Sequence, residues 1–119
     1  MLYKRISMPL YHQILHIAIC EDAEKEILEV RKKFYANVDR FEFSGYAEAE
    51  GKHHLILLNK KYLKYDQPFT IGTIAHEAFH ITNFVMKRVG IKPDVNNDEA
   101  QAYLLSWIIE EVYKFYKNK

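Results

Sequence analysis

The sequence is poor in the residues that mark disulfide-rich or unstructured chains. Its 119 residues include one cysteine (Cys20), four glycines, three prolines and one tryptophan. A single cysteine excludes a disulfide framework within the chain and a cysteine-built metal site. Hydrophobic residues make up 49% of the chain and charged residues 28%. This composition is typical of a folded chain, and its length suits a single domain over residues 1–119.

An excess of charge of one sign and a long apolar run are also missing. The formal net charge is +1, and the lysines and arginines are spread along the chain. This excludes the concentrated positive field with which proteins bind nucleic acid. No apolar run approaches the roughly 20 residues that cross a bilayer, and residues 1–10 lack the apolar stretch of a signal peptide. We therefore expect no nucleic-acid or membrane partner and a cytoplasmic location.

Hydrophobic periodicity predicts an α+β domain with the element order β-α-β-β-α-α. The apolar run 14–19 indicates a buried strand, and 41–50 with 53–58 indicate a hairpin that turns near Glu50 and Gly51. Helices are expected over about 23–34, 68–89 and 98–117, with Asp22 and Gly90 as end signals. We expect a small, mostly antiparallel sheet of about three strands packed on these helices.

The second expected helix contains the run His76-Glu77-Ala78-Phe79-His80. Residues four apart lie above one another on a helix, so both imidazoles project from one face and can hold one ion. Glu77 lies one step round the helix, where it can reach water on the metal without being a ligand. This spacing predicts a zinc ion, with Glu77 as general base for a zinc-activated water. The alternative is a surface stripe that binds no metal.

A catalytic zinc site needs a third protein ligand. Glu99 follows His80 after eighteen residues, at the start of the next expected helix, and can meet the two imidazoles if that helix folds back. Asp98 is the competing ligand, with a shorter side chain. The alternative for both acids is a favourable position at a helix N-terminus.

Residues 70–110 resemble the gluzincins, the thermolysin-like branch of the zincin metallopeptidases. The resemblance rests on the His-Glu-x-x-His motif and, more loosely, on Asp98-Glu99-Ala100. It implies a minimal zincin-like fold with an active-site helix and a glutamate helix, zinc as cofactor and hydrolysis of peptide bonds. A strand above the active-site helix would pair with extended peptide substrate. Short sequences of this kind also occur among phage and prophage proteins.

Within this resemblance, His76, His80 and Glu99 are implied as zinc ligands and Glu77 as the base. The chain departs from the family pattern one turn after Glu99, where Tyr103 replaces the usual carboxylate. Tyr103 could donate a hydrogen bond to the developing oxyanion. Its other interpretation is an ordinary buried tyrosine.

Two other functions remain open from the sequence. A deformylase-like amide hydrolase would use Cys20 as a zinc ligand, and a non-catalytic zinc-binding interaction module would keep the metal without hydrolysis. Cys20 also fits a small buried hydrophobe. His53 and His54 are expected at a strand surface on opposite sides. An apolar stripe on the last helix predicts core packing or a homodimer surface, and it comprises Leu104, Trp107, Ile108, Val112 and Phe115.

Overall fold

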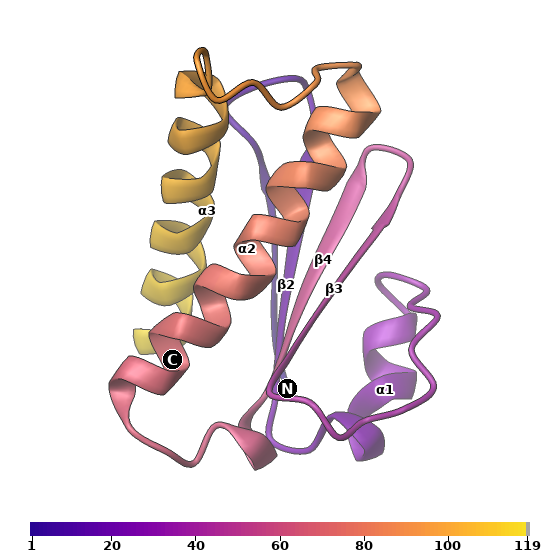
Figure 1. Cartoon of the computed structure of the whole chain (residues 1–119). Coiled ribbons are helices and arrows are strands. Elements are labelled where there is room, and N and C mark those ends of the chain that lie inside the picture. Colours follow the sequence, from indigo (N-terminus) through magenta and orange to yellow (C-terminus); the bar gives the residue numbers. More distant parts are fainter. Residues whose placement is uncertain (119) are drawn as a thin grey trace.

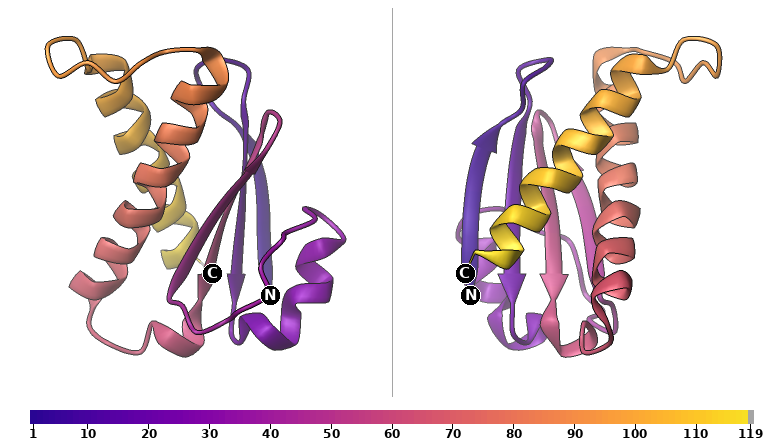
Figure 2. Two further views of the ribbon diagram at one scale, coloured as in Figure 1. Left: turned by 45° about the vertical axis from the view of Figure 1, so that its right-hand side comes forward. Right: turned by 90° about the vertical axis from the view of Figure 1, so that its left-hand side faces the viewer.

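The computed structural model describes residues 1–118, which form an α+β fold with helices on both faces of one four-stranded sheet (Figures 1 and 2). The elements in chain order are β1 (Leu2–Ser7), β2 (Ile14–Cys20), α1 (Ala23–Arg31), β3 (Gly45–Glu50), β4 (His53–Asn59), the short 3-10 helix η1 (Lys60–Tyr62), α2 (Gln67–Val89) and α3 (Glu99–Lys117). Helices α2 and α3 cover one face of the sheet, and α1 lies against the other.

The sheet has the strand order β1-β2-β4-β3, so β1 and β3 form its two edges. The pairs β1–β2 and β3–β4 are antiparallel, whereas β2 and β4 run parallel. The expectation of a mostly antiparallel sheet is confirmed, but the expected number of about three strands is wrong because β1 was not anticipated. An edge strand is partly exposed and carries mixed polar and apolar residues, and this hides it from a hydrophobic-pattern search.

The helix ends follow the expected local chemistry. Asp22 caps α1 by accepting a hydrogen bond from the Glu24 backbone N–H at 3.2 Å. Asp66 caps α2 in the same way, through the Phe69 N–H at 2.9 Å. Gly90 ends α2 with a φ of 80°, a left-handed conformation that glycine adopts without steric cost.

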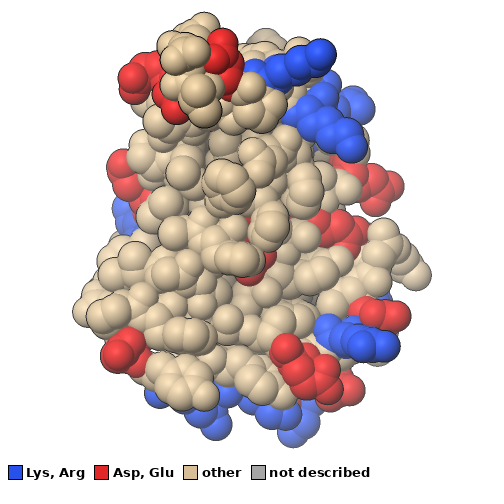
Figure 3. Space-filling view, in the orientation of Figure 1, with Lys and Arg blue, Asp and Glu red and all other residues tan. Residues whose placement is uncertain are grey.

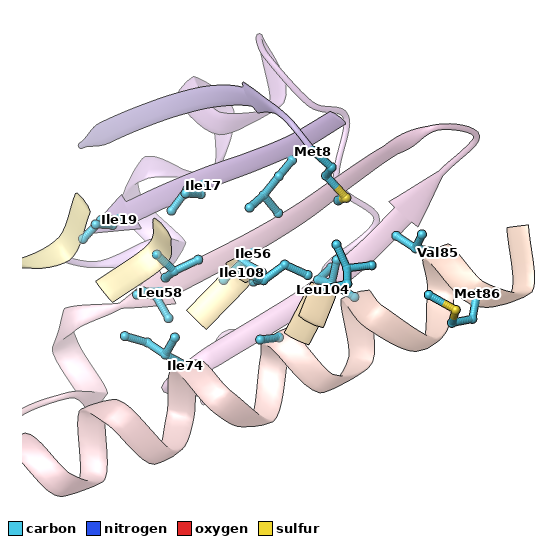
Figure 4. Packing of buried hydrophobic residues seen from close by; sticks show 14 of the residues in the cluster. Met8, Ile17, Ile19, Ile56, Leu58, Ile74, Val85, Met86, Leu104 and Ile108 are labelled. Atoms are coloured by element: carbon cyan, nitrogen blue, oxygen red, sulfur yellow. The ribbon is translucent and has the colours of Figure 1, made fainter. Parts of the chain in front are cut away.

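Two apolar clusters fill the two sides of the sheet. On the α2 and α3 side, strand residues such as Ile17 and Ile56 meet Ile74 of α2 and Ile108 of α3 (Figure 4). Within the stripe on α3, Leu104, Ile108 and Val112 are fully buried, so core packing is confirmed for them. Burial of this apolar surface orients α2, because its core positions fix which residues face outward.

The side chains of β3 bring α2 close to the edge of the sheet. Gly45, Ala47 and Ala49 alternate along β3 on one face, opposite Leu58, Ile56 and His54 of β4. Ala47 packs against the cluster that contains the buried residues of α2. Small residues on this face leave space for a helix, so α2 runs beside β3 (Figure 1).

The two central strands carry more buried polar groups than expected. The prediction that His53 and His54 lie at the strand surface is wrong for His54, which is fully buried on β4. His54 Nε2 lies 2.9 Å from Gln13 Oε1, a hydrogen bond that offsets part of the cost of burying the ring.

Residues 41–43, expected in the hairpin, precede β3, which begins at Gly45. No helix within residues 1–118 is both long and apolar enough to span a membrane.

Candidate metal centre

His76 and His80 project from the exposed face of α2 and approach each other closely. Their Nε2 atoms are 3.2 Å apart, and their ring centroids are 4.8 Å apart at an interplanar angle of 80°. The ring of His80 also stacks on Phe84 one turn later. One helical turn therefore directs both ring nitrogens at the same point in space.

This geometry fits a zinc ion held by both rings. Zinc binds histidine nitrogens at about 2.0–2.1 Å, and in a tetrahedral arrangement two such nitrogens lie about 3.3 Å apart. The observed 3.2 Å is close to that separation. The donor set also fits, because imidazole nitrogen and carboxylate oxygen are common zinc ligands. The ligand atoms of His76, Glu77 and His80 lie within 4.8 Å of one another.

Glu77 lies beside the imidazoles but on the buried side of α2. Its exposed fraction is 7%, and β3 covers it. A Cβ atom on Gly45 would stand 2.8 Å from Glu77 Cγ and 3.1 Å from Glu77 Oε2. The same Cβ would stand 2.8 Å from Thr73 Cγ2. Gly45 thus allows the strand backbone to approach the carboxyl group directly.

The surroundings of Glu77 change its acidity. Burial raises the pKa of Glu77 above the usual carboxyl value, while nearby His76 and His80 act to lower it. A raised pKa makes the carboxylate a stronger base. The side chain therefore combines a position next to the two imidazoles with an increased tendency to accept a proton.

A pocket of about 560 Å³ opens between α2 and the start of β3. His76 and Glu77 form one part of its wall, and Phe43 and Phe69 supply apolar surface. The other lining residues are Glu42, Ser44, Gly45, Gly72 and Thr73. Ser44 and Thr73 join the two sides of the pocket through their hydroxyl groups, at 3.2 Å. The space-filling view shows little charge on the central part of this face (Figure 3).

The sequence pointed to only part of this pocket. It singled out His76 and Glu77, whereas β3 begins at Gly45, on the opposite side of the pocket. The role of Gly45 as the contact of Glu77 was missed, as was the part played by Thr73. A glycine at a strand end is a common turn signal, so only the three-dimensional packing reveals its second role.

The residues predicted on the following helix lie outside this cluster. Within the described chain, the group that could hold a metal comprises His76, Glu77 and His80, without Glu99 or Asp98. Glu99 is the first residue of α3 and is exposed. Asp98 is its N-cap residue but makes no side-chain capping hydrogen bond. Tyr103 is 52% exposed one turn further on, so it is not a buried tyrosine.

Cys20 lies far from this cluster in the fold. It is fully buried and belongs to the apolar cluster on the α1 side of the sheet. Burial raises the pKa of its thiol to about 12, and this disfavours the thiolate that would bind a metal. Cys20 is therefore a small core residue, as one of the two sequence interpretations held.

Comparison of the chain with protein-family models, curated proteins and solved structures gave no match.

Proposed function

We propose that the protein is a zinc-dependent metallopeptidase of minimal, gluzincin-like form. The observation that carries the proposal is the 3.2 Å separation of the His76 and His80 Nε2 atoms on one exposed turn, directly beside a buried carboxyl group. Structural zinc sites are closed by four protein ligands, whereas both of these histidines are exposed. Their exposure supports an open, catalytic centre over a structural one.

The chemistry divides between the metal and the chain. A zinc ion supplies Lewis acidity, which polarises a carbonyl group and acidifies water. His76 and His80 would hold the ion, and Glu77 would accept the proton of the attacking water molecule and pass it to the leaving nitrogen. Burial favours this role, because it raises the pKa of Glu77 and fixes the carboxyl group against β3.

The position of β3 supports an extended peptide as substrate. β3 is an edge strand of the sheet formed by residues 1–118, so one side of its backbone has no strand partner there and can pair with a peptide. The pocket beside it contains His76 and Glu77, and its apolar walls at Phe43 and Phe69 suit a substrate side chain. A peptide on the edge of β3 would therefore pass the metal centre.

Glu99 is our proposed third ligand, as the family resemblance implies. The loop over residues 90–98 is exposed throughout, and the side chain of Asp98 makes no capping hydrogen bond to α3. The start of α3 thus has few contacts to oppose a shift towards the imidazoles. We expect binding of the ion to be coupled to ordering of this helix start, with Tyr103 one turn behind. A cytoplasmic location is part of the same proposal.

The deformylase-like alternative has less support, because Cys20 lies under α1 on the far face of the sheet. A non-catalytic zinc module predicts the same metal binding without hydrolysis, so a mutational comparison must separate it from the peptidase.

The direct test is the metal content of purified protein after dialysis against zinc. We expect about one zinc ion per chain in the wild type and a large loss of zinc in His76→Ala. The control is His12→Ala, which removes an exposed histidine outside α2 and should keep the zinc content of the wild type. Zinc should also raise the free energy of unfolding, by about 2.7 kcal/mol at a free concentration of 100 Kd. A wild type that binds zinc no better than His76→Ala would refute the metal centre. A zinc-loaded wild type that cleaves no member of a peptide library would refute the peptidase.

A further inference from the structure

A second group of histidines lies on the opposite face of the sheet, beside the segment that follows α1. Tyr3, His16 and His53 come from β1, β2 and β4 and are joined by two hydrogen bonds. Tyr3 Oη lies 2.7 Å from His16 Nδ1, and His16 Nε2 lies 2.9 Å from His53 Nδ1. His16 is 4% exposed, and the ring of Phe34 packs edge-on against it.

The two hydrogen bonds fit one consistent set of donors and acceptors. Burial raises the pKa of Tyr3 to about 12, so the phenol keeps its proton and can donate it to His16 Nδ1. Burial lowers the pKa of His16 to about 4, so this ring is neutral at neutral pH. If Nδ1 accepts from Tyr3, the proton of the His16 ring is on Nε2. In this arrangement His16 Nε2–H donates to His53 Nδ1, and the N–H group that His53 can offer to a ligand is at Nε2.

At its His53 end, this hydrogen-bonded series of side chains borders a pocket of about 320 Å³. His16 and His53 line it, together with Arg5 of β1 and Lys33 from the segment that follows α1. Neither Arg5 nor Lys33 forms a salt bridge with any residue in 1–118, although the ammonium of Lys33 lies over the ring of Tyr3. Glu50, which faces His53 across the β3–β4 hairpin, is the single acid in the wall.

We propose that this pocket binds a phosphate group, with Arg5, Lys33 and the Nε2–H of His53 as donors. Two cations and one directed N–H group outnumber the one carboxylate, and they offer donors to several oxygens of the same anion. Neither Arg5 nor Lys33 has to give up a carboxylate partner among residues 1–118 to bind the anion. The rings of Phe34 and Tyr35 add apolar wall, and the pocket lies at the small end of ligand sites. This favours a small phosphorylated molecule over a macromolecule.

The site is independent of the metal centre, because the sheet separates them and no residue is shared. His16 and His53 lie on the same face of the sheet as Tyr3 and Phe34. The metal-binding helix covers the other face. A phosphate bound at zinc and a phosphate bound here can therefore be distinguished by mutation.

The test is a titration of the zinc-free protein, residues 1–119, with inorganic phosphate, phenyl phosphate and acetate. Binding is monitored by the ¹⁵N NMR signals of the histidine rings. We expect saturable shifts of His53 with both phosphates, tighter binding of phenyl phosphate and no comparable binding of acetate. Arg5→Ala and Lys33→Ala should each weaken binding by about tenfold, because each removes a charge-assisted hydrogen bond. Glu50→Gln should tighten it severalfold.

Two controls separate this site from general charge effects. Lys4→Ala removes a cation from the other face of β1, where Lys4 lies over Phe115, and should leave phosphate binding unchanged. His76→Ala should leave it unchanged as well. The proposal is wrong if no saturable His53 shift appears, if acetate binds as tightly as phosphate, or if Lys4→Ala weakens binding as much as Arg5→Ala. A loss of binding in His76→Ala would also overturn it.

Discussion

Gly45 of β3 lies against Glu77 of α2 with no space for even one methyl group between them. The Cβ of an alanine at position 45 would stand 2.8 Å from Glu77 Cγ and 2.8 Å from Thr73 Cγ2. Real Cβ atoms avoid contacts this short, so the glutamate side chain or the strand must move. The position of the proposed catalytic base therefore depends on a glycine in a different element.

The first prediction follows from this contact. Gly45→Ala should displace Glu77 and lower kcat/KM for peptide hydrolysis by about 100-fold, as a misplacement of about 1 Å commonly does. Zinc affinity should fall much less, because His76 and His80 are exposed on the other side of the turn. The measurement pairs steady-state kinetics with zinc titration. Gly72→Ala is the control, since a Cβ there meets nothing within 4 Å. Equal activity in the two variants would show that the Gly45 contact does not position the base.

The second prediction concerns the proton acceptor. Glu77→Gln keeps the size of the side chain but removes its basicity, so it should retain zinc and lose hydrolysis by a factor of about 100 to 10,000. Glu42→Gln is a matched control, because Glu42 lines the same pocket and is exposed. Metal analysis and kcat on one peptide would be measured for both variants. Full turnover in Glu77→Gln would assign the base to another group.

The third prediction separates the two acids at the start of α3. If Glu99 completes the metal site, Glu99→Ala should weaken zinc binding by at least about tenfold, whereas Asp98→Ala should change it little. Both residues are exposed and neither forms a salt bridge among residues 1–118, so both variants should fold normally. Competition with a zinc chelator would give the two affinities. The reverse order would make Asp98 the ligand.

The fourth prediction concerns stability against acid. Burial is the main cause that lowers the pKa of His16 and His54 to about 4 each, from an ordinary value of 6.5. Below pH 6.5 both rings become protonated in the unfolded chain, whereas in the folded protein they stay neutral down to about pH 4. The unfolded state therefore binds more protons in this range, so acid favours unfolding. The free energy of unfolding should fall by a few kcal/mol between pH 6.5 and pH 4 and be nearly constant just above that window.

Urea unfolding at pH 7.5, 6 and 5 would measure this dependence. His54→Gln removes one of the two rings and should flatten the dependence, while His12→Gln, at an exposed position, should not. An unchanged slope in His54→Gln would mean that this imidazole is protonated in the fold as readily as in the unfolded chain.

The sequence predicted the helices better than the sheet, for physical reasons. The bounds of α2 follow from local chemistry at Asp66 and Gly90, and its burial pattern follows from periodicity. β1 was missed because half of its residues are solvated at a sheet edge. Parallel pairing of β2 with β4 depends on partners that are 39 residues apart, such as Ile14 and His53. No local signal carries that information.

The candidate site divides in the same way. The spacing of His76, Glu77 and His80 is a property of a single helix, so their mutual geometry could be predicted from the sequence. The place of Glu99 depends on how far α2 extends beyond His80 and on the path of the loop. These are set by packing of α2 on α3, so Glu99 as a ligand stays a prediction.

The order of the strands and helices along the chain has a consequence during synthesis of the polypeptide. The four strands are complete by Asn59. Among residues 1–118, the sheet face that contains Ile17, Ile56 and Leu58 is covered by α2 and α3, which are synthesised after the strands. A nascent chain that stops short of α2 therefore exposes an apolar surface that invites aggregation. Helix α2, which carries the two exposed imidazoles, is also the first of the two helices to cover that apolar surface. Truncation or unfolding of α2 should therefore promote aggregation and also remove the proposed metal centre.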